Sequence, residues 1–242
     1  MKRMTRPIVL LGVLAMAGCT LHLDRATTLK SGFPHGSVYS VDGDVRVEPS
    51  AHVRKISVVD GDILLGNWAH ASGLRSVDGR IKLDPGVICT GNVQSINGRI
   101  TLAEGVRIEG DVRTLTASID ADNAFIGGQL VTVAGRVRLT GATHVAKGIL
   151  LPKPDPHMTV NNHEERRLPE LVIGPGVVIE GPIVAERGSV LKVSRQAKIG
   201  EVRGVSVQWF DGAAPPLEHR AEPSKDGTST VSKTYSQAVP GE

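Results

Sequence analysis

The 242-residue chain is 40% hydrophobic but only 3% aromatic, and it contains 28 glycines and 14 prolines. These values exclude a helical bundle, and the absence of a triplet glycine period excludes a collagen. The formal charge of +3 comes from Lys2, Arg3 and Arg6, because without them 25 basic residues balance 25 acidic ones. The charge therefore does not indicate a nucleic-acid partner. The composition instead predicts an all-β chain with an aliphatic core and many turns.

The segment from Met1 to Gly18 has the layout of a secretory signal peptide. Three basic residues precede an apolar stretch from Pro7 to Ala17, which is too short to span a bilayer. The end of this stretch, Leu14-Ala15-Met16-Ala17-Gly18-Cys19, resembles the processing box of bacterial lipoproteins. This resemblance implies that residues 1–18 are removed and that Cys19 is acylated, so that residues 19–35 form an anchor and linker.

Acylation of Cys19 predicts where the protein is located. Several acyl chains hold a protein on a membrane, whereas a single chain gives only marginal binding. Thr20 rather than Asp follows the cysteine, which in the lipoproteins it resembles favours the outer membrane, facing the periplasm. Cys89 is then the only remaining thiol, so no intramolecular disulfide can form and stability must come from packing.

A five-residue motif recurs six times between residues 41 and 137. Its central positions are 43, 61, 79, 98, 117 and 135, which are separated in turn by 18, 18, 19, 19 and 18. The copies are Val41-Asp42-Gly43-Asp44-Val45, Val59-Asp60-Gly61-Asp62-Ile63, Val77-Asp78-Gly79-Arg80-Ile81, Ile96-Asn97-Gly98-Arg99-Ile100, Leu115-Thr116-Ala117-Ser118-Ile119 and Val133-Ala134-Gly135-Arg136-Val137. A period this steady is typical of a repeat architecture.

Apolar residues lie at fixed distances from the central residue, which we number position 0. Positions −5, −2, +2 and +4 are apolar, beginning with Val38, Val41, Val45 and Val47. This spacing predicts a strand that runs through the glycine, with positions −2, 0 and +2 facing inward. Turn signals such as Asp84-Pro85-Gly86 follow position +4, and a second short strand follows each turn.

One copy cannot bury its apolar face alone, whereas stacked copies form a continuous core, which is the physical basis of a β-solenoid. Neighbouring strands lie about 4.8 Å apart, so six coils predict a rod about 30 Å long. We therefore expect an all-β, single-chain β-solenoid, with about six 18- to 19-residue coils over 36–150 and about two further coils over 170–212. Phe33 is predicted to close the N-terminal end, and Trp209 and Phe210 the C-terminal end.

Two segments depart from the solenoid pattern. Residues 151–169 begin with a run that contains Pro152, Pro154 and Pro156, and a polar run follows. Proline cannot donate to a strand ladder, so we interpret 151–169 as an extruded loop. Coil-like sequence resumes with Leu171-Val172-Ile173-Gly174. Residues 213–242 are predicted to be a disordered tail, because they contain too little apolar surface to fold.

The units Val-Asp-Gly-Asp-Val at 41–45 and Gly-Val-Val-Ile-Glu-Gly-Pro-Ile at 176–183 resemble the bactofilin-like, polymer-forming group of bacterial β-solenoid proteins. The resemblance covers about 38–150 and 171–210. It implies a right-handed solenoid that assembles end to end without nucleotide and serves as a scaffold. The lipoprotein leader, the proline-rich interruption and the long tail depart from that group and favour a membrane-anchored scaffold over a cytosolic filament.

Charged residues occupy the positions on either side of the central glycine. Position −1 holds Asp42, Asp60, Asp78, Asn97, Thr116 and Ala134, and position +1 holds Asp44, Asp62, Arg80, Arg99, Ser118 and Arg136. The four carboxylates of Asp42, Asp44, Asp60 and Asp62 could accept a cation such as calcium, which takes several oxygen ligands. The alternative is a solvated polar face that Arg80 partly neutralises.

Position −9 combines two imidazoles and a thiol, which have the ligand chemistry of zinc. The residues there are His52, His70, Cys89, Ile108 and Ile126. The isoleucines indicate that this column packs at the edge of the core, and the sequence offers no evident fourth ligand. We therefore predict no metal site and no cofactor.

An enzymatic alternative comes from the C-terminal coils. Ile173-Gly174, Ile179-Glu180, Ala185-Glu186 and Leu191-Lys192 have a six-residue spacing that resembles the hexapeptide repeat of left-handed solenoid acyltransferases. Those enzymes use a histidine as general base, a role that His157 or His163 could take. The 18- and 19-residue coils argue against this family, and the chain has no phosphate-loop or nucleophile-elbow motif.

The sequence therefore predicts a non-enzymatic lipoprotein of the bacterial envelope that acts as a scaffold. Its predicted partners are the membrane, through the N-terminal lipid, and further copies of itself, through the ends of the solenoid. A binding module for a cell-envelope glycan or a cation, and the acyltransferase, are the alternatives.

Overall fold

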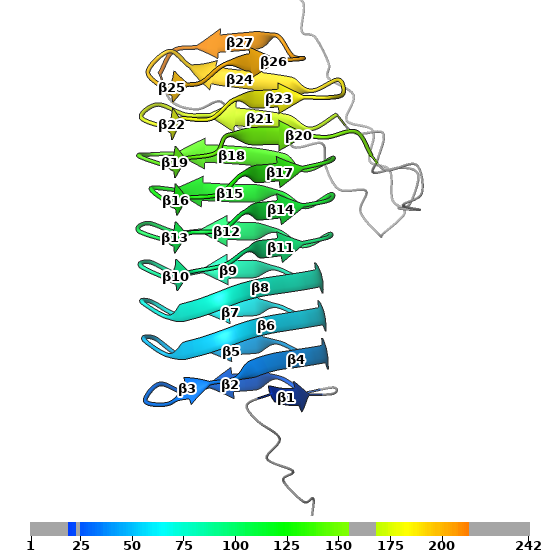
Figure 1. Cartoon of the computed structure of the whole chain (residues 1–242), viewed down its shortest axis with the longest axis vertical. Helices are drawn as coiled ribbons and strands as arrows, with labels where there is room; N and C mark the ends of the chain where they lie inside the picture. Colours follow the sequence, from blue (N-terminus) through cyan, green and yellow to red (C-terminus); the bar gives the residue numbers. More distant parts are fainter. Residues whose placement is uncertain (1–18, 23–24, 155–167, 213–242) are drawn as a thin grey trace, which may run out of the picture.

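Aliphatic residues at a period of 18–19 build a parallel β-solenoid in the computed structural model, which describes residues 19–22, 25–154 and 168–212. Every strand pairing is parallel and joins neighbouring coils. Figure 1 shows the coils stacked along one axis. The prediction of an all-β solenoid is confirmed, and the described residues form about ten coils without a helix.

One sheet, which we call sheet B, takes one strand from each coil. Its ten strands are β2 (Thr27–Leu29), β5 (Val45–Val47), β7 (Ile63–Leu65), β9 (Ile81–Leu83), β12 (Ile100–Leu102), β15 (Ile119–Asp122), β18 (Arg136–Thr140), β21 (Glu170–Ile173), β24 (Val190–Ser194) and β27 (Val207–Phe210). Positions +2 and +4 of the repeat lie on these strands and are buried in all six copies.

The other sheet, sheet A, consists of two strand columns. The first column contains β3 (Pro34–His35), β10 (Ile88–Cys89), β13 (Arg107–Ile108), β16 (Phe125–Ile126), β19 (His144–Val145), β22 (Val178–Ile179) and β25 (Lys198–Ile199). The second contains β1 (Cys19–His22), β4 (Ser37–Asp42), β11 (Val93–Ser95), β14 (Val112–Thr114), β17 (Leu130–Thr132), β20 (Ile149–Leu151), β23 (Ile183–Ala185) and β26 (Val202–Arg203). The nine-residue strands β6 (His52–Asp60) and β8 (His70–Asp78) belong to both columns.

The solenoid is longer than the sequence predicts. Residues 27–35, which we expected to be a linker, contribute β2 and β3, and these pair with β5 and β6 of the next coil. After the interruption, the chain returns in register, because Leu171 of β21 pairs with Val137 of β18. Two complete coils then follow, as the sequence predicts, and β27 adds the first strand of another. The central part of the predicted loop, 155–167, the leader 1–18 and the tail 213–242 lie outside the described residues.

A single aliphatic core extends along the axis of the solenoid. Position −5 supplies Val38, Ile56, Leu74, Val93, Val112 and Leu130, and each of these is at most 1% exposed. Positions +2 and +4 face them from sheet B, with Ile63, Leu65, Ile81 and Leu83 among the most completely buried side chains. Short aliphatic residues fill this narrow interior without aromatic rings, as the composition predicts.

The predicted strand through the glycine is wrong, because the chain turns a corner there. β4 ends at Asp42 and β5 begins at Val45, so Gly43 lies between sheet A and sheet B. Gly43, Gly61 and Gly79 have φ values of 127°, 139° and 142°. The corner changes the alternation of inward and outward residues, and position −2 therefore faces outward, with Val41 and Val59 exposed.

Buried hydroxyl groups stabilise this glycine corner. Position −3 holds Ser40, Ser76, Ser95, Thr114 and Thr132, all of them buried, with Val58 in the remaining copy. The hydroxyls of Ser40, Ser76 and Ser95 donate to the carbonyl oxygens of Gly43, Gly79 and Gly98 at 3.1, 3.3 and 2.8 Å. These side chains satisfy backbone groups that leave the strand ladder at the turn.

Candidate functional site

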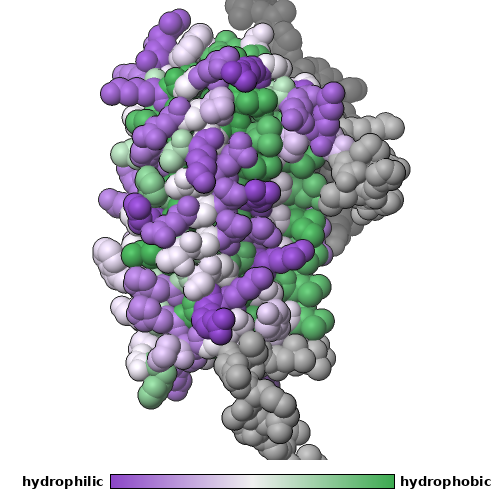
Figure 2. All heavy atoms as spheres, viewed as in Figure 1, coloured by the Kyte–Doolittle hydropathy of each residue, from purple (hydrophilic) through white to green (hydrophobic). Residues whose placement is uncertain are grey.

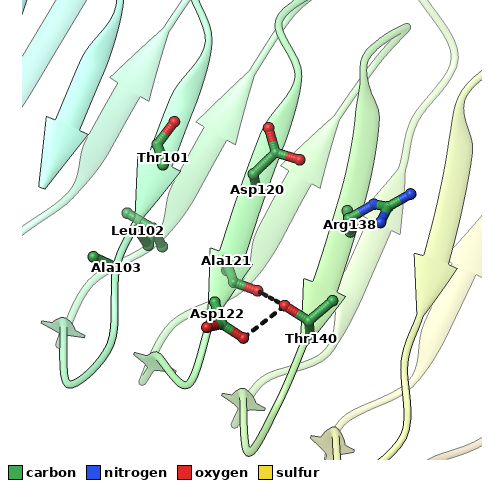
Figure 3. Close-up of a pocket in the computed structure, with 8 residues that line it drawn as sticks. All are labelled: Thr101, Leu102, Ala103, Asp120, Ala121, Asp122, Arg138 and Thr140. Carbon is green, nitrogen blue, oxygen red and sulfur yellow. Dashed lines mark hydrogen bonds between the residues drawn. The ribbon is translucent and has the colours of Figure 1, made fainter. Parts of the chain in front are cut away.

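A shallow hollow lies on the outer face of sheet B, where it spans β12, β15 and β18 (Figure 3). Its volume is about 160 Å³, and its lining residues are Thr101, Leu102, Ala103, Asp120, Ala121, Asp122, Arg138 and Thr140. The Thr140 hydroxyl contacts the Asp122 carboxylate at 2.8 Å, and Asp120 lies 3.6 Å from Arg99. Ligand pockets usually exceed about 300 Å³, so this hollow could take only part of a small polar molecule.

The carboxylates of position +1 tie successive coils together at the glycine corner. Asp44 accepts a hydrogen bond from the Asp62 backbone N–H at 2.9 Å. Asp62 in turn accepts from the Arg80 backbone N–H at 2.8 Å and from the Arg80 guanidinium at 2.7 and 3.1 Å. Burial alone would raise the pKa of Asp62, but the hydrogen bonds and positive charge of Arg80 outweigh it and hold this pKa below its ordinary value.

Position −1 forms a second polar ladder. Asn97 donates from its amide to Asp78 at 2.7 Å, and the Thr116 hydroxyl lies 2.9 Å from the Asn97 amide oxygen. Asp42, Asp60 and Asp78 are also in register along the backbone. Within the described part of the chain, no group of three or more His, Cys, Asp or Glu residues could hold a metal ion. The carboxylates of Asp44, Asp62 and Asp78 thus carry hydrogen bonds between coils. The alternative of a cation site at Asp42, Asp44, Asp60 and Asp62 has no geometric support in the described residues.

The predicted column of two histidines and a thiol does not form. His52 pairs with His70, and their rings stack at 4.5 Å, but the next residue in that column is Ile88. Cys89 pairs with Ala71 in the adjacent, inward-facing column. Val93 pairs with Leu74 in the same way. However, Ala71 lies three positions before Leu74, whereas Cys89 lies four positions before Val93. Counting back from the glycine therefore shifts Cys89 by one position, and a shift of one residue reverses the face of a strand.

The burial of Cys89 makes its thiol unreactive. The side chain is completely buried, and burial raises the pKa of the thiol to about 11. The reactive species of cysteine is the thiolate, which this environment disfavours. Cys89 is therefore a core residue, whereas His52 lies exposed on the outer surface.

The two ends of the described solenoid have unpaired strand edges. β1, β2 and β3 pair only with the coil above them, and β25, β26 and β27 only with the coil below. At the N-terminal end Phe33 is 74% exposed. At the C-terminal end Trp209 pairs with the buried Val193, so it continues an inward-facing column of sheet B, and it is 48% exposed, while Phe210 is partly buried. At the C-terminal end, the inward-facing side chains of Ile199, Val202 and Val207 remain partly exposed.

Some of the candidate residues from the sequence lie in the described part of the chain, and others lie outside it. Cys19 is the first residue of β1, which pairs with β4. His157 and His163, the candidates for a general base, lie outside the described residues. None of the described segments contains a helix long and apolar enough to cross a membrane. The serine and threonine column at position −3 was missed, although it recurs in the sequence with the same period as the glycines.

Comparison with family models, curated proteins and solved structures finds no match. The strand register therefore establishes the β-solenoid fold without assigning a family. Membership of the bactofilin-like group is a hypothesis that rests on the Val-Asp-Gly-Asp-Val and Gly-Val-Val-Ile-Glu-Gly-Pro-Ile units.

Proposed function

We propose that this protein is a non-enzymatic β-solenoid scaffold of the bacterial envelope, anchored to a membrane through acylated Cys19, and that it self-associates through its uncapped C-terminal coil. The observation that carries this proposal is the open end at β25, β26 and β27. Among the described residues, each of these strands has a partner on one side only, which leaves backbone N–H and C=O groups for pairing with another chain.

The side chains of the last coil support the same conclusion. Ile199, Val202 and Val207 lie in the inward-facing columns that are completely buried in the coils below, but in the last coil they are partly exposed. Trp209 adds an aromatic side chain to this end. Covering it with a second chain would remove apolar surface from water and extend the ladder, and both effects favour association.

The position of Cys19 determines which end is available. Because Cys19 begins β1, an acyl group on this residue places the first coil next to the membrane. Ten coils at about 4.8 Å each put the C-terminal end about 45 Å from the first coil along the solenoid axis. The lipoprotein-like leader and Thr20 favour the outer membrane, with the solenoid facing the periplasm.

Association of the C-terminal ends can be measured by sedimentation velocity on the full chain carrying Cys19→Ser. We expect the average mass to increase across a hundredfold range of concentration. The substitution Trp209→Glu places a charge at the open end and should shift the protein toward the monomer. A parent protein that stays monomeric over the whole range would contradict the proposal.

A matched control separates the end from the side of the solenoid. Trp68 is 63% exposed in the turn between β7 and β8, far from the C-terminal end, and has a φ of 60°. Trp68→Asn therefore removes an exposed tryptophan while keeping a residue type that tolerates this backbone conformation. It should leave association unchanged.

The lipid anchor has a separate test. Cells that express the full chain are fed a labelled fatty acid, and the protein is recovered from the membrane fraction. We expect label on the parent and on the Cys89→Ser control, but not on Cys19→Ser. Equal labelling of the Cys19→Ser variant would show that the anchor is not at this residue.

A further inference from the structure

An unbroken row of aliphatic side chains runs along the outside of the solenoid at position −2. It consists of Val41, Val59, Val77, Ile96, Leu115 and Val133, and we call it the corner ridge. Val41 and Val59 are 44% and 48% exposed, and the other four are partly exposed. Figure 2 shows hydrophobic surface along the right-hand edge, where the glycine corner lies. Outward-facing columns on either side of this ridge carry charged residues, so the ridge is not a general property of the surface.

The backbone keeps these six residues in line. Their strands are in parallel register, and the N–H groups of Asn97, Thr116 and Ala134 bond to the carbonyls of Val77, Ile96 and Leu115. Six rungs span about 24 Å. A contiguous apolar strip of this length is typical of an interaction surface, whereas single exposed aliphatic residues are ordinary.

The charges beside the ridge change sign along the axis. The first two rungs carry Asp42, Asp44, Asp60 and Asp62, all acidic. At position +1 the later rungs carry Arg80, Arg99 and Arg136. The corner is therefore acidic toward the N-terminal end and basic toward the C-terminal end.

We propose that the corner ridge pairs with the corner ridge of a second copy of this chain, with the two solenoids antiparallel. The twofold axis lies between the rungs of Val77 and Ile96, so that Val41 of each copy faces Val133 of the other. Apolar residues then meet along the whole ridge, and the arrangement is self-complementary, as a twofold interface requires.

The charge distribution selects the antiparallel orientation. It places the rung of Asp42 and Asp44 in each copy opposite the rung of Arg136 in the other. At the centre, the rung of Asp78 and Arg80 faces the rung of Asn97 and Arg99. A parallel pair would instead place the acidic rungs of one copy against the same acidic rungs of the other, and like charges across an interface suppress association.

This pairing goes beyond the proposed function, because it uses the side of the solenoid and not its ends. It also places the two Cys19 residues at opposite ends of the pair. If both are acylated and inserted in one membrane, the pair lies along the membrane surface.

Cross-linking tests the orientation on the full chain with Cys19→Ser and Trp209→Glu, which removes association through the C-terminal end. In this background, one protein carries Val41→Cys and another carries Val133→Cys. We expect a short bis-maleimide to join the two proteins when they are mixed and to leave each one uncross-linked by itself. Cross-linking of the Val41→Cys protein to itself, or no cross-link in the mixture, would overturn the proposal.

Two further variants control for random collision and for charge. Lys82→Cys, exposed on the outer face of sheet B, should not cross-link to Val41→Cys. Asp42→Arg should weaken pairing about tenfold, and adding Arg136→Asp should restore it, because the opposed charges are exchanged. Failure of the double variant to recover pairing would contradict the assigned register, and neither result depends on association through the ends.

Discussion

The two corners that precede and follow sheet B both turn the chain through left-handed backbone conformations, but they restrict the sequence differently. At the glycine corner, Gly43, Gly61 and Gly79 have φ values between 127° and 142°. At the opposite corner, which we call the turn corner, Ser50, Trp68 and Asn123 occupy positions with φ between 48° and 60°. At the turn corner three coils therefore place a side chain at the left-handed position, whereas at the glycine corner only Ala117 of the six repeat copies carries one.

The difference lies in the space available along the solenoid axis. A Cβ atom on Gly61 would lie 2.6 Å from the Gly43 carbonyl oxygen, and one on Gly79 or Gly98 would lie closer still to the glycine below. At the turn corner, a Cβ on Gly105 would have no neighbour nearer than 3.6 Å. Close approach of backbones thus selects glycine at the glycine corner, whereas at the Gly105 turn only the backbone conformation favours it.

Of the substitutions that test this comparison, Gly79→Ala should lower the free energy of unfolding most. The methyl group collides with the Gly61 backbone, which cannot move without breaking its own ladder, and the φ of 142° is unfavourable for alanine. Strain and overpacking together predict a loss of about 3 kcal/mol or more in the free energy of unfolding. Denaturant unfolding followed by circular dichroism measures this loss, and a loss below that of Gly105→Ala would contradict the comparison.

Removing the hydroxyl that supports the glycine corner should have the next largest effect. Ser95 donates to the Gly98 carbonyl at 2.8 Å and accepts from the Gly98 N–H at 3.1 Å, and its side chain is buried. Ser95→Ala leaves both backbone groups without this partner, so the unfolding free energy should fall by about 2 kcal/mol. Ser72→Ala, at an exposed serine of β8, is the control and should leave it nearly unchanged.

Gly105→Ala tests the turn corner and should cost less. Its φ of 72° disfavours alanine, but the added methyl group makes only ordinary contacts. We expect the unfolding free energy to fall by about 1 kcal/mol. Gly105→Asn, which suits this conformation better, should recover part of the loss in the same denaturant measurement. A loss for Asn larger than that for Ala would show that space, and not conformation, limits this corner.

The period of the central glycines and the apolar positions −5, +2 and +4 were sufficient to predict the solenoid and its core. These positions predict the fold because coil stacking requires the same residue type at the same place in every coil. The direction of position −2 could not be predicted in this way, since Val41 and Val45 have the spacing of one strand whether or not the chain turns at Gly43.

The errors at Cys89 and at position −3 have separate causes. Some coils are one residue longer than others, and the sequence does not show on which side of Cys89 the additional residue lies. The structure places it between Cys89 and Val93. Ser95 and its equivalents recur as regularly as the glycines, but a polar residue is assigned to the surface unless a buried backbone partner is known.

The smallest predicted effect concerns the charge of Asp62 at the glycine corner. Asp62→Asn keeps a side-chain oxygen that can accept from the Arg80 N–H, so it removes mainly the interaction with the guanidinium. The folded-state pKa of Asp62 is depressed, so its charge stabilises the protein above the unfolded-state pKa of about 4. This contribution is lost as the pH falls through the folded-state pKa. The parent should therefore be more thermally stable than the variant at pH 7. This difference in stability should be smaller in 1 M salt, and it should disappear as the pH falls below about 4. A difference that stays constant from neutral to acid pH would show that the ladder at this corner depends on hydrogen-bond geometry and not on charge.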